Sequence, residues 1–118
     1  MEKLEINHQR GISILKIQGD IEGDDGSQLL EIVQGAEQGA LPFWLLEIPD
    51  TNFMDSNVLE SILQIALYLR ERKGDLFIAA PTPGVREILM ITKLDKKIKI
   101  FAAVENALEN IYQTQPGR

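Results

Sequence analysis

The sequence predicts a single α/β domain in which a mixed, mainly parallel β-sheet of about five strands is layered against about four helices. The chain opens with two short apolar–polar alternating segments joined by a turn, a pattern typical of a β-hairpin. Three further strand-like apolar runs then alternate with helical patterns, which favours parallel β–α–β units. We expect the domain to span residues 1–113 and a disordered tail to occupy 114–118.

The composition is that of an ordinary globular domain, with 118 residues of which 44% are hydrophobic and 25% charged. The absence of cysteine excludes disulfides, thiolate metal sites and cysteine nucleophiles. Residues 1–6 lack the basic start and apolar core of a signal peptide, and no apolar run is long enough to cross a bilayer. These features predict a cytoplasmic protein with no membrane insertion.

Charge is distributed unevenly along the chain, whose net charge is −6. The segment 17–69 contains many acidic residues and no lysine or arginine, whereas basic residues outnumber acidic ones in the segment 70–99. The acidic half would repel a phosphate backbone, which argues against binding of nucleic acid there. It favours instead a partner that carries a basic surface.

The opening hairpin is predicted from Leu4–Asn7 and Ile12–Ile17, with Gln9–Gly11 as the turn. His8 is the single histidine of the chain. Without cysteine or a second histidine it makes a poor metal site, so an exposed place at a strand end is expected.

The loop Gly19–Gly26 is rich in glycine and carboxylates, and it invites comparison with a calcium-binding loop. The first, third, fifth and twelfth places of such a loop would be held by Asp20, Glu22, Asp24 and Glu31. Asp25 stands where glycine is needed for the sharp turn, Ser27 replaces the usual apolar residue, and no helix precedes the loop. No bound metal is therefore expected, and the acids suit the start of a helix.

The remaining elements follow from hydrophobic periodicity and from helix start and stop signals. The buried type of strand is predicted for the nearly continuous apolar runs. We expect strands at Phe43–Ile48, Leu76–Ala80 and Ile98–Phe101, and helices at Ser27–Gln38, from about Ser56 to Lys73-Gly74, from Thr82-Pro83 with Val85, Ile88, Leu89 and Ile91 on its core side, and at Val104–Tyr112.

The junction Ile48–Glu60 carries the clearest candidate site, because a serine lies between a buried strand and a long amphipathic helix. Three residues suited to helix capping follow one another in Asp55-Ser56-Asn57. A hydroxyl there would face the free amides and the positive end of the helix dipole, so Ser56 can cap the helix or hold a phosphate. Asn57 and Glu60 have the spacing of a capping-box pair.

The common enzyme motifs are missing. The chain has no GxxxxGK phosphate loop, no GxGxxG dinucleotide motif and no Gly-x-Ser-x-Gly elbow. The single histidine has no recognisable relation to a nucleophilic serine. The sequence therefore predicts neither an enzyme nor a cofactor.

Four segments in a fixed order resemble one known family. Gly19–Glu22 is similar to a Gly-x-Leu-Asp motif, and Phe53–Ser56 with Leu59 is similar to apolar-apolar-Asp-Ser-Ser/Thr-Gly-Leu. Arg72–Pro81 resembles a Gly-x-x-Leu strand, and Val85–Leu94 resembles the helix that follows it. The order and spacing of these segments resemble the STAS domain of bacterial anti-sigma factor antagonists and sulfate-transporter tails.

The resemblance implies a regulatory binding module. In that family the serine after the aspartate, here Ser56, is phosphorylated by a partner that is both anti-sigma factor and kinase. The unphosphorylated form binds this kinase and releases a sigma factor, phosphorylation ends the binding, and a phosphatase resets the switch. We expect a monomer or weak dimer. The expected partner-binding residues are Asp55, Asn57, Val58, Glu60, Glu22, Asp24, Phe53 and Met54, although packing in the core and the loop is the favoured alternative for Phe53 and Met54.

The chain departs from the family pattern directly after Ser56. Asn57 stands in place of the second serine or threonine, and Val58 in place of glycine. A side chain at Val58 is expected to narrow the approach of a kinase to the helix start. The alternative is a STAS-like scaffold or transport-system subunit with a constitutive interface, in which Ser56 only caps the helix.

Overall fold

The predicted hairpin forms one edge of the β-sheet in the computed structural model, which describes residues 4–36 and 42–114. Strand β1 (Leu4–Gln9) runs antiparallel to β2 (Ile12–Ile17), and Gln9 pairs with Ile12 across the turn. Arg10 and Gly11 have φ values of 52° and 85°, as a two-residue type I′ turn requires. His8 is exposed on β1, as expected, with its Nδ1 3.1 Å from the hydroxyl of Ser13.

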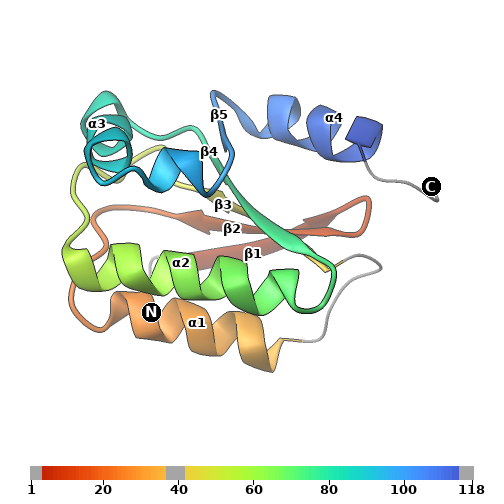
Figure 1. Ribbon diagram of the computed structural model, residues 1–118, viewed down its shortest axis with the longest axis horizontal. Coiled ribbons are helices and arrows are strands. Elements are labelled where there is room, and N and C mark those ends of the chain that lie inside the picture. The colour runs from red at the N-terminus through yellow and green to blue at the C-terminus, as the bar shows by residue number, and fades with distance from the viewer. Residues whose placement is uncertain (1–3, 37–41, 115–118) are drawn as a thin grey trace.

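Three parallel strands continue the sheet in chain order, which gives the order β1-β2-β3-β4-β5 (Figure 1). The two further central strands are β3 (Phe43–Glu47) and β4 (Asp75–Ala79), and β5 (Ile100–Phe101) forms the other edge. The helices are α1 (Asp25–Gly35), α2 (Ser56–Arg70), α3 (Pro83–Ile91), the short 3₁₀ helix η1 (Leu94–Lys96) and α4 (Val104–Thr114). The predicted α/β class and mixed sheet are confirmed.

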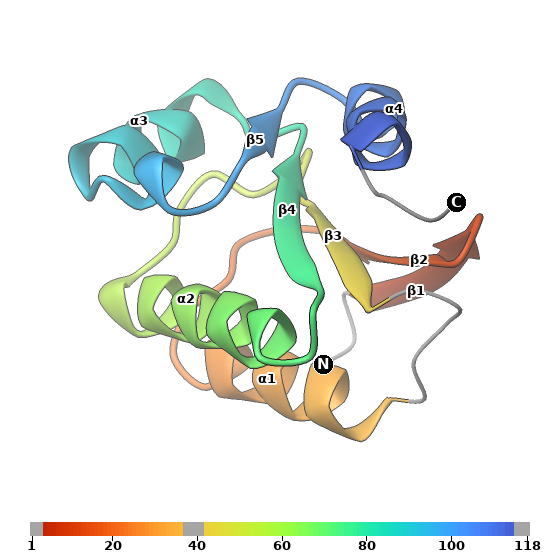
Figure 2. The ribbon, with the colours of Figure 1, turned by 45° about the vertical axis from the view of Figure 1, so that its right-hand side comes forward.

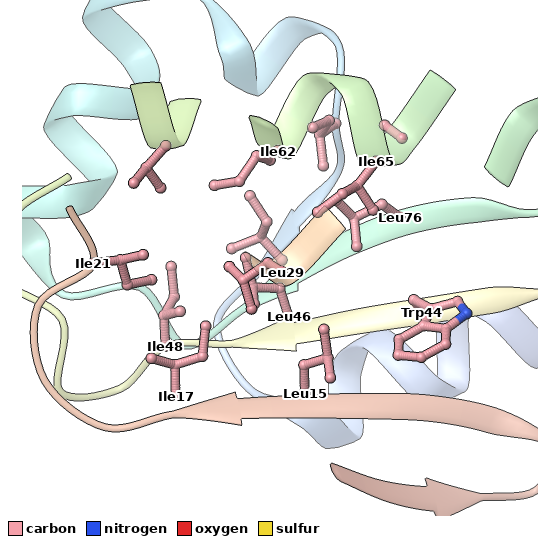
Figure 3. Packing of buried hydrophobic residues seen from close by; sticks show 14 of the residues in the cluster. Leu15, Ile17, Ile21, Leu29, Trp44, Leu46, Ile48, Ile62, Ile65 and Leu76 are labelled. Carbon is pink, nitrogen blue, oxygen red and sulfur yellow. The ribbon is translucent and has the colours of Figure 1, made fainter. Parts of the chain in front are cut away.

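The sheet is covered on both faces, by α1 and α2 on one side and by α4 on the other (Figure 2). On the first face, strand residues such as Leu15, Trp44 and Leu46 pack against Leu29 and Ile62 of the helices (Figure 3). The second core, under α4, contains Ile12, Ile14, Phe43, Leu45, Phe77, Ala79, Ala107, Leu108 and Ile111. Because successive side chains alternate between faces, β3 is buried on both, as its apolar run predicted.

Helix α1 begins at Asp25, two residues before the predicted start, so Gly26 belongs to the helix and not to the preceding loop. Gly26 is buried against α2, and a Cβ atom there would lie 2.7 Å from Ser61 Oγ and 3.0 Å from Val58 Cα. Glycine therefore allows the two helices to approach closely. The helix ends at Gly35, three residues before the predicted Gln38, because Ala36 is extended with φ −77° and ψ 144°; Gln38 itself lies outside the described residues.

The end of α2 follows the prediction. Lys73 adopts a left-handed φ of 65°, and the amide of Gly74 donates to the carbonyl of Leu69 at 2.8 Å, which closes the helix. A Cβ atom on Gly74 would overlap the carbonyl oxygen of Pro42, so only glycine fits between the end of α2 and the start of β4. The start of α3 is also as predicted, with Thr82 as N-cap and Pro83 in the first turn.

Three predictions for the C-terminal third need correction. Strand β5 is shorter than expected because Ile98 is buried in the core directly after η1, which leaves Ile100 and Phe101 to pair with β4. Ile91 is 71% exposed and does not lie on the core side of α3. Helix α4 includes Thr114, the first residue of the expected tail, and 115–118 lie outside the described residues. No helix in the described part of the chain is both long and apolar enough to cross a membrane.

Candidate functional site

Three loops meet at the edge of the sheet where the parallel strands end, because the carboxyl ends of parallel strands point the same way. They connect β2 to α1, β3 to α2 and β4 to α3. Ile21 of the first loop forms a parallel bridge with Met54 of the second. Thr51 Oγ1 donates to the carbonyl of Gly19 at 2.7 Å, and Thr82 Oγ1 donates to the carbonyl of Thr51 at 2.7 Å.

These loops are held together by polar contacts that sequence reasoning did not predict. Thr51 is fully buried, and the amide of Asn52 donates to Asp20 Oδ1 at 2.8 Å. The partners are about thirty positions apart in the chain, so no local pattern connects them. Gly23 has a left-handed φ of 59°. In the sequence, the only indication of this turn was a glycine between two acids in a glycine-rich loop.

Asp55 is the N-cap of α2 and joins the helix to the β2–α1 loop. Its Oδ1 accepts from the amide of Val58 at 3.0 Å, and its Oδ2 accepts from the amide of Gly23 at 2.8 Å. These bonds lower the pKa of Asp55 below its ordinary value of 3.8, the Gly23 bond being the largest cause, with partial desolvation opposing them. The amide of Asn57 also faces this carboxylate and lowers its pKa. The carboxylate is thus ionised at neutral pH.

Ser56 is the first residue of α2 and is exposed to solvent. It does not cap the helix, because Asp55 occupies that position. Within the described residues its hydroxyl has no hydrogen-bond partner. The predicted capping box of Asn57 and Glu60 is also wrong: both side chains are exposed, and the cap bond runs from Val58 to Asp55. Ser56 therefore lies at the helix start with a hydroxyl that makes no hydrogen bond to the described part of the chain.

Two of the expected partner-binding residues face the core. Val58 and Met54 are 0% and 2% exposed and belong to the cluster between the sheet and α2. The expectation that they contact a partner is thus contradicted, because a hydrophobic side chain at either place is used for packing. Since the Val58 side chain points inwards, it does not narrow the approach to Ser56, contrary to the expectation from its replacement of glycine.

The other expected residues are at the surface near Ser56. Phe53 is 48% exposed, and Asn57 and Glu60 are exposed in the first turns of α2. The bond from Gly23 to Asp55 brings Glu22 and Asp24, both exposed, beside the same helix end. The result is an acidic rim with one exposed aromatic side chain.

The acidic residues of these loops do not form a cluster that could hold a metal ion, among the described residues. Across residues 4–36 and 42–114, no three His, Asp or Glu side chains gather closely enough to hold an ion. Asp25, which would sit inside a calcium loop, begins α1, and its Oδ2 accepts from the amide of Glu22 at 3.1 Å. Glu31 lies two turns along the same helix, so the four residues with calcium-loop spacing do not surround one point.

Comparison with known proteins agrees with this architecture. The family profile described as the STAS domain matches residues 3–107. The chain belongs to the STAS domain family. Among curated proteins, it is similar to the anti-sigma F factor antagonist of Paenibacillus polymyxa, with 22% identity over 110 residues, which cover 92% of this chain and 94% of the relative.

Solved structures share the fold at low identity. An anti-sigma factor antagonist from Mycobacterium paratuberculosis superposes with a TM-score of 0.79 at 19% identity, covering 92% of each chain. The unphosphorylated antagonist SpoIIAA gives 0.77 at 19% identity, covering 95% of this chain and 98% of that one, and Bacillus SpoIIAA in its phosphorylated form gives 0.67 at 18%, covering 92% and 98%. A sulfate transporter family protein from Wolinella succinogenes gives 0.77 at 13% identity, covering 86% and 85%.

Proposed function

We propose that this chain is a partner-switching regulator of the anti-sigma factor antagonist type. Its unphosphorylated form binds an anti-sigma factor that is also a serine kinase, and phosphorylation of Ser56 ends that binding. The observation that carries the proposal is the placement of Ser56, which is exposed at the start of α2 while Asp55 performs the capping. The hydroxyl can be modified without loss of a hydrogen bond among the described residues.

Phosphorylation would act on the charges around Asp55. A phosphate adds about −1.5 to −2 charge at pH 7 next to a carboxylate that is already ionised. Phosphate and carboxylate would compete for the same amides at the helix start. Because Asp55 also accepts from Gly23, weakening its position would loosen the loop that carries Glu22 and Asp24. The modification thus changes both the charge and the shape of the surface.

The rim around Ser56 suits a partner with a basic surface and an apolar pocket. Glu22, Asp24 and Glu60 supply negative charge that would steer a basic partner. Phe53, half exposed among these acids, has the character of a buried anchor in an interface. Added phosphate bulk and the cost of its desolvation would then oppose contact with a partner face shaped for a small neutral hydroxyl.

The relatives support this choice of function. The relative from Paenibacillus polymyxa is named an anti-sigma F factor antagonist, and SpoIIAA has been solved in phosphorylated and unphosphorylated forms. A reset by a phosphatase, as in the family, completes the proposed cycle. The role is that of a protein-binding module without a catalytic centre of its own.

The test is incubation with a cognate anti-sigma serine kinase and ATP, followed by mass spectrometry and pull-down. Ser56→Ala should block phosphate incorporation and keep kinase binding, and Ser56→Asp should weaken binding. Ser27→Ala is a matched control, because Ser27 is also an exposed serine in the first turn of a helix. Equal binding of wild type and Ser56→Asp to the kinase would refute the switch.

A constitutive interface in a transport system is the second candidate, favoured by the likeness to the sulfate transporter family protein. In that case a membrane transporter would retain the chain in pull-down, and Ser56→Asp would leave its binding unchanged. The version of this hypothesis in which Ser56 caps the helix is excluded by the cap bond of Asp55.

A further inference from the structure

An apolar and basic surface surrounds the end of α3 and the turn that follows it. Met90 and Ile91 are 58% and 71% exposed, the highest values among the large hydrophobic side chains of the described residues. Exposed lysines follow directly after them in the chain. We call this surface the lysine patch, and it consists of Met90, Ile91, Lys93, Lys96, Lys97 and Lys99.

The lysine patch is held in place by buried neighbours. Leu94 and Ile98 are 7% and 1% exposed and belong to the main core. The amide of Ile98 donates to the carbonyl of Leu94 at 2.9 Å, and Lys93 has a left-handed φ of 63°, which turns the chain from α3 into η1. Anchoring of these two apolar side chains inwards leaves the lysines directed to solvent. The surface is therefore preformed.

Glu87 is exposed one turn before Met90 and Ile91, but no acid of the described residues forms an ion pair with a lysine of the patch. Within the described residues the ion pairs are Arg70 with Asp75 and Arg72 with Glu71, and none involves a lysine. Asp95 is the acid inside the segment, and its Oδ1 is buried without a hydrogen-bond partner in the same part of the chain. The exposed charge between Lys93 and Lys99 is accordingly positive in a chain whose net charge is −6.

We propose that the lysine patch docks the protein on the surface of an anionic lipid bilayer. Exposed aliphatic side chains beside lysines suit the boundary between acyl chains and charged headgroups. Each lysine near such a surface contributes about 1 kcal/mol, and its long stem allows the ammonium to remain with the headgroups. Nucleic acid offers no comparable place for Met90 and Ile91, because its phosphates would contact the lysines alone.

The acidic β3–α2 loop contacts the start of α3 through the bond from Thr82 to Thr51, whereas the lysine patch lies at the other end of that helix. Helix α1 lies on the opposite side of the molecule from α3 (Figures 1 and 2). Charges are screened over about 8 Å at physiological ionic strength. With the lysine patch towards the lipid, repulsion from α1 is therefore weak. The proposal does not depend on phosphorylation of Ser56.

The experiment is co-sedimentation of the full chain with vesicles of phosphatidylcholine alone or mixed with phosphatidylglycerol. Binding is expected to the anionic vesicles and to fall as salt is raised. Lys96→Gln with Lys97→Gln should lower the partition coefficient roughly 30-fold, from about a fivefold effect per lysine. Ile91→Ser should lower it about tenfold through lost apolar burial.

The matched control variants are on β1 and β2, at the edge of the sheet farthest from β5. Lys16→Gln on β2 removes one charge and is compared with Lys96→Gln alone, and Ile6→Ser on β1 changes a side chain that is 48% exposed. Thermal unfolding followed by circular dichroism checks that each variant is folded. Equal partition into both kinds of vesicle, or equal effects of the control and patch variants, would overturn the proposal. If polyglutamate competes with the vesicles for binding, and Ile91→Ser leaves the affinity for polyglutamate unchanged, the patch binds an acidic protein instead.

Discussion

The close contact between α1 and α2 can be tested by adding a single methyl group at Gly26. The added Cβ atom would lie 2.7 Å from Ser61 Oγ, 2.9 Å from Ser61 Cβ and 3.0 Å from Val58 Cα. Val58 Cα is backbone, so the helices must separate or shift. Such overpacking typically costs about 1–3 kcal/mol, against which alanine gains up to about 1 kcal/mol over glycine in a helix. We expect Gly26→Ala to reduce the free energy of unfolding by about 1–2 kcal/mol.

The control is Gly35→Ala in the same helix, because a Cβ atom there meets nothing within 4 Å. That variant should stabilise the fold by about 0.4–1 kcal/mol through the lower entropy of the unfolded chain. Both free energies come from urea unfolding, with the slope m checked for two-state behaviour. Ser61→Ala combined with Gly26→Ala should recover part of the loss, since it removes the nearest atom. If Gly26→Ala is as stable as Gly35→Ala, the close packing of α1 and α2 is refuted.

Two further predictions concern the loops around Ser56. The pKa of Asp55 is lowered in the folded state, so its ionised form stabilises the fold at pH values above 3.8, and this stabilisation is lost as the pH falls through the lowered pKa. The difference in unfolding free energy between wild type and Asp55→Asn should therefore shrink in acid, and a difference that is constant from pH 7 to about pH 3 would contradict this account. Thr51→Val keeps the shape of a fully buried side chain but leaves the carbonyl of Gly19 without its donor, so a loss of about 1–3 kcal/mol is expected in urea unfolding. The exposed Thr114→Val is the control, and equal stability of both variants would show that the bond between these loops is unimportant.

The placement of Ser56 shows how far local reasoning reaches. Three adjacent residues able to cap a helix located the start of α2 correctly, because a cap side chain needs amides two or three positions ahead. The choice of Asp55 among the three depended on Gly23, thirty-two positions earlier, which donates to the second carboxylate oxygen. A carboxylate can accept from both amides at once, and this double contact exists only after the sheet has brought the loops together.

Two aliphatic side chains were misplaced, for different reasons. Val58 replaces a family glycine and was expected to obstruct the site, but the rotation of α2 on the sheet turns it into the core. Ile91 continues an apolar run along α3, but this helix is buried through Val85 and Leu89, and at about 100° per residue Ile91 lies on the side away from Leu89. The burial of Val58 depends on which element lies opposite it, whereas the exposure of Ile91 follows from helical spacing counted from Leu89.

The sequence by itself determined the hairpin, the alternation of strands and helices, the family and the start of α2, because each depends on residues close together in the chain. The tertiary structure alone decided that Asp55 and not Ser56 caps α2, and that Val58 and Met54 face the core. It also decided which acids surround the serine. These features arise where parallel strands deliver distant loops to one edge, and their energies come from contacts that form only on folding.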